Sequence, residues 1–476
     1  QPNGSVSFVV PDIMARTPAG EFSVFSGNGA AAWSDAAVIC PWTLYLHYGD
    51  TRLLSEQYVS MAGWVNYMRE HADADLIWRK GFQFGDWLDY RGSFALMPSP
   101  VTNNELVATA FFAYSTTLLA QIAQVLGKTE DAATYTALAD NVKAAFNAEF
   151  VSASGRVGPN SQTAYVLALH FDLLPEAARP ATAARLADIV RNNNYHLTTG
   201  FVGTPYLCHV LSRYGQTDVA YELLNQESYP SWIYPVKKGA TTIWERWDGI
   251  KPDGSFQDAG MNSFNHYAYG AIGEWLYRVV AGIETDPAEP GYKHILFQPQ
   301  PGGGLTSVRA TLDSPYGPLA AAWELTAQDF RLNVTVPPNA HATVRLPAQA
   351  LADVAEGGQP LALGNGILKI ASGDGVVTIE IGSGDYAFVT TGLNLSQAMA
   401  KVKHVAGRLD RYTTLRELLA NEKAKAVLLT YLSPTFLQTP QLFMVMDGPL
   451  VQVAGMAPKV LTPQTLDAIE AALMAN

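Results

Sequence analysis

The stretch ELVATAFFAYSTTLLAQIAQVLGKTEDAATYTALADNVKAAFNAEF, Glu105 to Phe150, contains two long segments with an apolar face. Its apolar residues recur at the spacing of an α-helix over residues 105–126 and again over residues 130–150. Gly127-Lys128 separates the two runs, and a glycine directly after a periodic segment is a typical helix end. The stretch therefore predicts two successive helices, each with one apolar face.

The same helical period dominates from about Ala32 to Ile283, with loops at fairly even intervals. Further segments with an apolar face are Gln162–Leu173 and Asp218–Leu224. Nine of the ten tryptophans lie in this region, between Trp33 and Trp275. Evenly spaced helices over this length predict an all-helical toroid or solenoid, although no sequence repeat at a fixed period is visible.

The pattern changes to short alternating runs from about Gly291 to Thr391. Examples are Arg331–Val336, Ala342–Leu346 and Val376–Ile381, with glycine, proline and asparagine turns between them. Such runs predict an antiparallel β-sandwich.

A helical pattern returns near the C-terminus. Leucines recur at helical spacing over residues 413–432, and Thr462-Pro463 is expected to cap a last helix over residues 464–474. The sequence thus predicts three parts: a helical domain over 1–283, a β-sandwich over 284–392 and an appended helical module over 393–476.

Composition excludes several classes of protein. The 476 residues are 48% hydrophobic and 16% charged, which supports a large core and excludes a disordered chain. The net charge of −12 argues against nucleic acid or an anionic membrane as partner. Cys40 and Cys208 lie far apart without metal-ligand spacing, so neither a metal site nor a disulfide framework is predicted. No apolar stretch reaches the roughly 18 residues of a membrane-spanning helix.

Three loops of the helical domain place tryptophan beside a carboxylate: Trp33-Ser34-Asp35, Gly85-Asp86-Trp87-Leu88-Asp89 and the run from Thr241 to Asp248. A fourth polar and aromatic cluster runs from Asn262 to Tyr267. Sugars present apolar faces that stack on indole rings and hydroxyl rims that need acceptors, so these loops are typical of a pyranose pocket. The structural alternative for each loop is a core ring beside a helix-capping acid.

Glu245 is the strongest catalytic candidate. Trp244 and Trp247 could desolvate its carboxylate, and Arg246 could pair with it. The structural alternative is an acid held in an ion pair with Arg246. His266 has a comparable alternative as a hydrogen-bonded core histidine.

These residues make the sequence resemble the bacterial α-L-rhamnosidases of glycoside hydrolase family 78. The matching stretches run in the family's order across roughly residues 1 to 390. They are Ala32-Trp33-Ser34-Asp35-Ala36 with Pro41-Trp42, Tyr48-Gly49-Asp50, Gly85-Asp86-Trp87-Leu88, Thr198 to Thr204, Tyr229-Pro230-Ser231-Trp232, Gly239 to Trp247 and Ser263 to Tyr267.

The resemblance implies an (α/α)6 barrel followed by a β-sandwich, and an inverting hydrolase of terminal α-L-rhamnosyl residues that needs no metal or organic cofactor. An inverting glycosidase uses one carboxylic acid to protonate the leaving oxygen and one carboxylate to activate water. Glu245 falls at the position of the family's general base. The expected substrate-binding residues are Trp33, Asp35, Asp86, Trp87, Trp244, Arg246, Trp247 and His266.

One element of the family pattern is missing from the sequence. The family's general acid lies in an Arg-Asp-Glu-Arg segment upstream of the matching stretches, and the chain contains no such segment. Together with the start at Gln1, this leads us to expect a fragment that lacks the first barrel helices and has weak or no activity. A replacement acid within the chain is the alternative, with Asp86 and Asp89 as candidates.

Two other functions stay open at this point. The chain could be a carbohydrate-binding protein on an inactive barrel, or another glycosidase or a phosphorylase on the same fold. The sequence leaves the aglycone, the compartment and the oligomeric state undetermined.

Overall fold

The structure is a computed structural model that describes residues 1–12, 29–89, 102–326, 328–394 and most of 409–474. Within the last range, residues 410, 412, 440–441, 443–445, 447–449, 451–452 and 455–456 are outside the description. The chain divides into two compact units, which we treat separately. The first contains residues 1–183, 199–217 and 270–401, and the second contains residues 184–198, 218–269 and 402–476.

Helices account for most of the regular structure before residue 281. They are α1 (Ala36–Tyr48), α2 (Thr51–His71), α3 (Asn104–Val125), α4 (Thr129–Phe150), α5 (Gln162–His170), η3 (Glu176–Ala178), α6 (Arg179–Asn192), α7 (Thr204–Arg213), α8 (Thr217–Leu224), α9 (Ile233–Lys237), η4 (Ala259–Met261), η5 (Ala268–Ala271), α10 (Ile272–Trp275) and η6 (Leu276–Val280).

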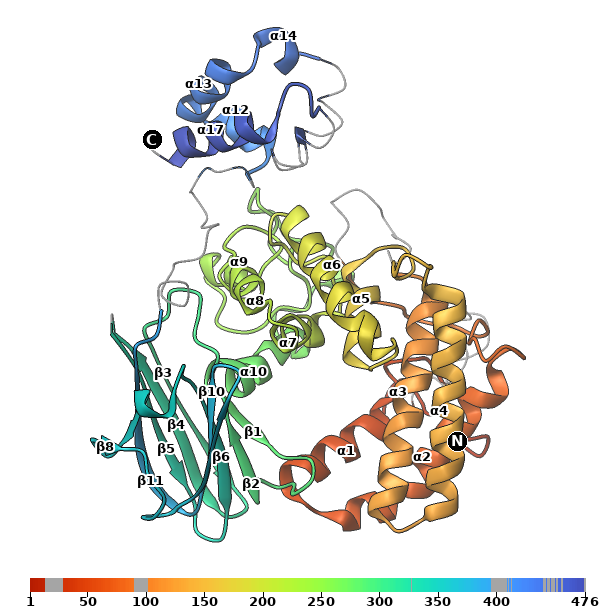
Figure 1. Ribbon diagram of the computed structural model, residues 1–476. Helices are drawn as coiled ribbons and strands as arrows, with labels where there is room; N and C mark the ends of the chain where they lie inside the picture. Colours follow the sequence, from red (N-terminus) through yellow and green to blue (C-terminus); the bar gives the residue numbers. More distant parts are fainter. Residues whose placement is uncertain are drawn as a thin grey trace. The chain divides into compact units, whose positions relative to one another are not determined.

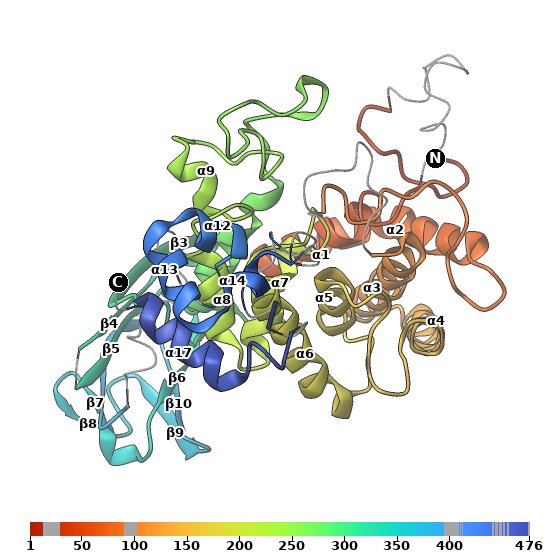
Figure 2. The ribbon, with the colours of Figure 1, turned by 90° about the horizontal axis from the view of Figure 1, so that it is seen from above.

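Helices α3 and α4 form the predicted pair and lie side by side (Figures 1 and 2). The buried face of α4 repeats every three or four residues, through Ala132, Tyr135, Ala139, Val142 and Phe146. Helix α3 is buried almost all round. By length and composition α3 could cross a membrane, but 83% of its apolar stretch is buried in the protein, as in the core helix of a globular domain.

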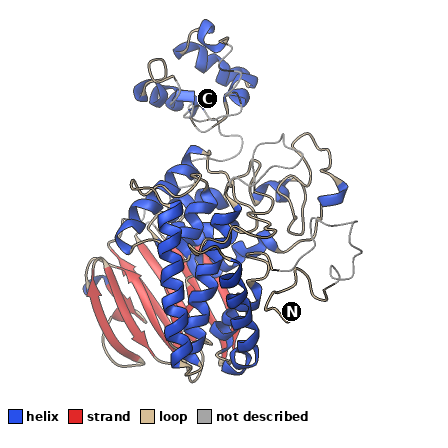
Figure 3. Cartoon of the chain, turned by 90° about the vertical axis from the view of Figure 1, so that its right-hand side faces the viewer, coloured by secondary structure: helices blue, strands red, loops and turns tan. Residues whose placement is uncertain are grey.

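Strands follow the helices and form the predicted sandwich. They are β1 (Ile283–Thr285), β2 (His294–Phe297), β3 (Ser307–Ser314), β4 (Gly317–Leu325), β5 (Asp329–Val336), β6 (His341–Pro347), β7 (Val354–Glu356), β8 (Gln359–Pro360), β9 (Ile367–Gly373), β10 (Val376–Ile381) and β11 (Gly384–Thr391), with a short turn of helix, η7 (Leu351–Asp353), before β7. Figure 3 shows these strands gathered in one region.

Two sheets pack face to face in the sandwich (Figure 1). One has the order β1-β2-β6-β10-β9 and the other β3-β4-β5-β11-β7-β8. Alternate residues of β5 and β10 are buried, as expected when each sheet has one face on a shared core. One pairing differs from the antiparallel prediction, because β2 and β6 run parallel. The chain leaves the first sheet after β2, builds β3 to β5 in the second, and returns in the original direction.

The C-terminal residues form a separate apolar core with α12 (Leu415–Ala420), α13 (Glu422–Tyr431), α14 (Pro434–Leu437) and α17 (Pro463–Met474). The leucine-rich run over 413–432 is two helices, because Asn421 ends α12 and accepts hydrogen bonds from the N–H groups of Lys423 and Ala424 at the start of α13. The predicted cap at the start of α17 is present, since Thr462 Oγ1 accepts from the Thr465 N–H at 3.2 Å.

Candidate active site

The predicted site residues fall into two groups, one in each compact unit. In the first unit, the ring of Trp33 stacks on Phe84, with centroids 4.3 Å apart and planes 26° apart. Phe84 in turn meets Trp87 edge to face, with centroids 5.7 Å apart. Phe84 therefore joins two tryptophans that are far apart in the sequence. Both indoles are only partly buried, as rings that contact a ligand must be.

Backbone conformation holds these two rings in place. Ala32 precedes Trp33 with φ 68°, and Leu88 follows Trp87 with φ 59°. Both are in the left-handed region, which costs a residue with a Cβ on the order of 1 kcal/mol or more. Gln83 links the two loops, because its Oε1 accepts the Ala31 N–H at 2.8 Å. Strain of this kind concentrates at functional sites.

The carboxylate of Asp35 is completely buried and occupied by protein donors. Its Oδ1 accepts from Trp64 Nε1 at 2.9 Å and Ser115 Oγ at 2.5 Å, and its Oδ2 accepts from the Ala32 N–H at 2.8 Å. Burial raises the pKa of the Asp35 carboxyl, and the three hydrogen bonds oppose that rise. This geometry favours a role in fixing the turn that carries Trp33 over direct contact with a sugar hydroxyl.

Asp86 is similarly enclosed, with 1% of the residue exposed. Its carboxylate accepts the N–H groups of Gly200, Val202 and Gly203 at 2.9, 2.8 and 3.1 Å, and the Thr163 hydroxyl donates to it as well. These amides lie just before α7, where helix N–H groups lack partners within the helix and attract an anion. Asp86 thus fastens the loop that bears Trp87 to the start of α7.

The glycines of the 198–204 motif are explained by this junction. A Cβ on Gly200 would lie 2.2 Å from the carbonyl oxygen of Trp87, and one on Gly203 would lie 2.4 Å from Thr163 Oγ1. The Phe201 N–H donates to the same Trp87 carbonyl at 2.9 Å. Only glycine permits this approach, so two motifs that the sequence shows separately form one structural unit.

In the second unit, the segment around Glu245 pairs with the segment around His266. The Glu245 N–H donates to the Ser263 carbonyl, and the His266 N–H donates to the Ile243 carbonyl, each at 2.9 Å. The Ser263 N–H returns a hydrogen bond to Glu245 Oε2 at 2.9 Å. Both side chains are partly exposed. The two strongest polar candidates therefore come from neighbouring backbone segments.

Arg246 does not pair with Glu245. Its Nε donates to Asp248 Oδ1 at 2.9 Å and its second terminal nitrogen lies 3.4 Å from Asp248 Oδ2. Gln257 Nε2 also donates to Asp248 at 2.5 Å. The structural alternative for Glu245, an acid held by Arg246, is wrong because Asp248 is the partner. No donor among the described residues contacts Glu245 Oε1.

Trp244 and Trp247 are each 5% exposed. Trp247 stacks on Tyr269 with centroids 3.9 Å apart and meets Trp232 edge to face at 5.6 Å. Its Nε1 is buried without a hydrogen-bond partner among the described residues. A small, mostly apolar pocket is lined by Trp232, Pro235, Val236, Ala240, Thr242, Ile243, Trp244, Arg246, Trp247 and Tyr269.

Comparison with known families decides the assignment. Residues 1–280 match the bacterial alpha-L-rhamnosidase 6 hairpin glycosidase domain, and residues 282–359 match the bacterial alpha-L-rhamnosidase C-terminal domain. The chain belongs to the bacterial α-L-rhamnosidase family. The helical domain and the two sheets have the fold of glycoside hydrolase family 78, as the sequence motifs predicted.

Several α-L-rhamnosidases resemble the chain closely. One from Streptomyces avermitilis is 44% identical over 362 residues, which is 76% of this chain and 33% of that protein. One from Formosa agariphila is 41% identical over 353 residues, covering 72% and 36%. The crystal structure of the Streptomyces avermitilis enzyme complexed with L-rhamnose matches 82% of this chain and 35% of its own, with 41% identity and a TM-score of 0.72. The chain thus spans about a third of the length of these relatives.

The structure of this rhamnosidase-family chain also contains contributors that sequence reasoning missed. Phe84 joins Trp33 to Trp87, Thr163 donates to Asp86, and Asp248 holds Arg246. The sequence could have indicated Phe84, since it alternates with Phe82 in the run just before Gly85-Asp86. It could not have indicated Thr163, because only the tertiary fold brings α5 to Asp86.

Proposed function

We propose that the protein to which this chain belongs is an inverting α-L-rhamnosidase that releases terminal α-L-rhamnosyl residues from glycosides. Family membership supports the substrate class. The arrangement around Glu245 supports the mechanism, and it is the observation that carries the proposal.

Glu245 is proposed as the general base. A base that activates water needs a carboxylate oxygen that the water can reach. Oε2 of Glu245 accepts the Ser263 N–H, and Oε1 has no donor among the described residues.

The aromatic residues are proposed to bind the sugar. Trp33 and Trp87, together with Phe84, offer apolar faces for the CH groups of a pyranose. His266 is proposed to hydrogen-bond a sugar hydroxyl, and its ring is oriented by the Ala268 N–H, which donates to Nδ1 at 3.3 Å. Trp244, Arg246 and Trp247 of the second unit are proposed as further substrate-binding residues.

Asp35 and Asp86, first predicted to bind hydroxyls, are proposed to act as positioning residues. Each carboxylate is buried and accepts several hydrogen bonds from the protein. For the same reason Asp86 is a poor candidate for a replacement acid, since a proton donor must reach the leaving oxygen.

For the 476-residue chain by itself we propose weak or no turnover, because the family's Arg-Asp-Glu-Arg segment is absent from its sequence. Rapid hydrolysis of an aryl α-L-rhamnoside by this chain would contradict that statement and would require an acid within it.

The test of the main proposal uses the protein with its natural flanking sequence. Hydrolysis of an aryl α-L-rhamnoside should release β-L-rhamnose as the first product, which proton NMR distinguishes from the α anomer. Initial release of α-L-rhamnose would overturn the inverting mechanism. Failure to cleave any α-L-rhamnoside, with turnover of another glycoside, would overturn the substrate class.

A further inference from the structure

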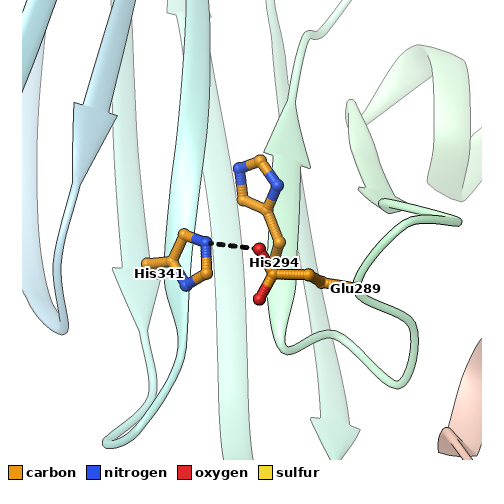
Figure 4. Close-up of side chains that lie close together, drawn as sticks. All are labelled: Glu289, His294 and His341. Carbon is orange, nitrogen blue, oxygen red and sulfur yellow. Dashed lines mark ion pairs between the residues drawn. The ribbon is translucent and has the colours of Figure 1, made fainter.

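Two histidines meet on the β-sandwich because strands β2 and β6 run parallel. Strands β2 and β6 are in register, with His294 opposite His341. Residues opposite each other on paired strands point to the same face. The two imidazole rings accordingly stack, with centroids 4.5 Å apart and planes 15° apart (Figure 4).

A carboxylate from the β1–β2 loop completes a cluster with these rings. Glu289 Oε1 lies 3.4 Å from His341 Nε2. One nitrogen from each histidine and one oxygen of Glu289 all lie within 4.8 Å of one another (Figure 4). Three side chains of the types that bind transition metals thus come together from two strands and a loop.

A second layer of polar groups orients His294. Its Nδ1 lies 2.8 Å from Asp286 Oδ2. Its Nε2, the nitrogen left to bind an ion, lies 2.8 Å from Thr343 Oγ1, a contact that ion binding must replace. An ionised carboxylate only accepts hydrogen bonds, so Nδ1 carries a proton in this contact. Metal-binding histidines usually donate the other ring N–H to a carboxylate in this way. Glu380 Oε2, 3.7 Å from His294 Nε2, is a further oxygen within reach.

The cluster is rich in carboxylates and open to solvent, as a cation-binding site requires. Three carboxylates, those of Asp286, Glu289 and Glu380, surround two histidines. The side chain of His294 is 13% exposed, that of His341 34% and that of Glu289 49%, so the cluster lies at the surface and an ion can enter from solvent.

We propose that Glu289, His294 and His341 bind a divalent transition-metal ion, with Zn²⁺ the best match to two imidazoles and a carboxylate. Lone pairs of nearly parallel rings do not converge, so binding turns at least one imidazole about its Cβ–Cγ bond. The ligand atoms also draw closer, since Zn–N and Zn–O bonds are about 2.0–2.2 Å long. The exposed Glu289 can follow the ion.

The ion has a structural role in this proposal. It ties the β1–β2 loop to β2 and β6 and stabilises the folded state through binding. The cluster shares no residue with the group proposed for rhamnoside hydrolysis, so the expectation that the reaction itself needs no metal is unaffected.

The test is a calorimetric titration of the dialysed 476-residue chain with Zn²⁺. One ion should bind saturably and raise the Tm. His341→Ala and the more conservative Glu289→Gln should each weaken that binding by about tenfold or more. His71→Ala, which removes a histidine of α2 outside the cluster, should leave it unchanged. Circular dichroism establishes that each variant is folded.

Binding of Co²⁺ is a second test, because the absorption spectrum of the bound ion depends on its ligand atoms. Its absorption spectrum should show nitrogen and oxygen coordination, and the signal should be lost in His341→Ala. The proposal is wrong if the chain shows no saturable binding at millimolar Zn²⁺, or if His341→Ala and Glu289→Gln bind like the parent chain. A thiolate charge-transfer band would assign the ion to the exposed Cys40 and would also overturn it.

Discussion

Glu245 and Ser263, 18 residues apart in the sequence, bind each other twice. The Ser263 N–H donates to Glu245 Oε2 and the Glu245 N–H donates to the Ser263 carbonyl, both at 2.9 Å. The first contact holds the carboxylate and the second holds its backbone. The side chain that we propose as the base is therefore oriented by the same segment that carries His266.

Replacing Glu245 with glutamine should abolish most rhamnoside hydrolysis in the protein with its natural flanking sequence. The amide keeps the shape and can still accept the Ser263 N–H, but it cannot take a proton from water. We expect kcat to fall by about 10²- to 10⁴-fold, the usual contribution of a general base. Steady-state kinetics with an aryl α-L-rhamnoside measures this fall in kcat.

The matched control for this variant is Glu56→Gln on α2, whose side chain is 60% exposed and outside both groups of site residues. It should leave kcat and the Tm unchanged. Near-normal hydrolysis by a folded Glu245→Gln variant would remove Glu245 from the mechanism.

The sequence predicted the order of the fold because period and turn chemistry are local properties. The helical run around α3 and α4 and the alternating run of β5 are examples. The change from helices to strands, between Val280 and Ile283, is another. The parallel pairing of β2 with β6 was not predicted. It depends on which strands become neighbours, and no local pattern of residues encodes that choice.

The sequence indicates which residue types could form the candidate site, but the exposure of each side chain depends on the tertiary structure. Trp33 and Trp87 were predicted to stack on a sugar because each lies near a carboxylate in a loop, and both rings are only partly buried. Asp35 and Asp86 were selected by the same rule, yet both are buried under protein donors. The backbone donors to Asp86 come from a loop 114 to 117 residues away, so its surroundings arise only in the tertiary structure.

Asp86→Asn should destabilise the first unit. Each carboxylate oxygen accepts at least one backbone N–H. The NH₂ group of asparagine must therefore face a backbone N–H on either side, and that N–H loses its acceptor. The expected loss is about 2–4 kcal/mol in the free energy of unfolding, measured by urea denaturation. Asp188→Asn on α6, with a side chain 67% exposed, is the matched control and should change little. Equal stability of the two variants would mean that Asp86 does not fasten α7.

His209 on α7 should make the stability depend on pH. Its Nε2 is buried without a partner among the described residues, and burial lowers the pKa of His209 to about 4 from the ordinary value of 6.5. The unfolded chain takes up the proton first as the pH falls, so stability is fully present above about pH 6.5 and declines toward pH 4.

The expected contribution of His209 is on the order of 3 kcal/mol across that range. Urea denaturation at several pH values measures it, and His209→Gln, which cannot titrate, should flatten the slope. Parallel pH profiles for the parent chain and His209→Gln would show that His209 contributes nothing to the dependence.

Gly200→Ala should damage both stability and sugar binding, because the new methyl group would lie 2.2 Å from the Trp87 carbonyl oxygen and 2.6 Å from the Asp89 N. Either the loop of Trp87 or the start of α7 must move, at a cost of about 1–3 kcal/mol. Since Trp87 is proposed to stack on the sugar, KM should rise more than kcat falls.

Gly273→Ala is the matched control: no atom lies within 4 Å of its new Cβ, and it lies in α10, where alanine is the better helix former. Thermal denaturation and steady-state kinetics on both variants, in the protein with its natural flanking sequence, decide the outcome. A Gly200→Ala variant as stable and active as Gly273→Ala would show that the junction between Trp87 and α7 tolerates displacement.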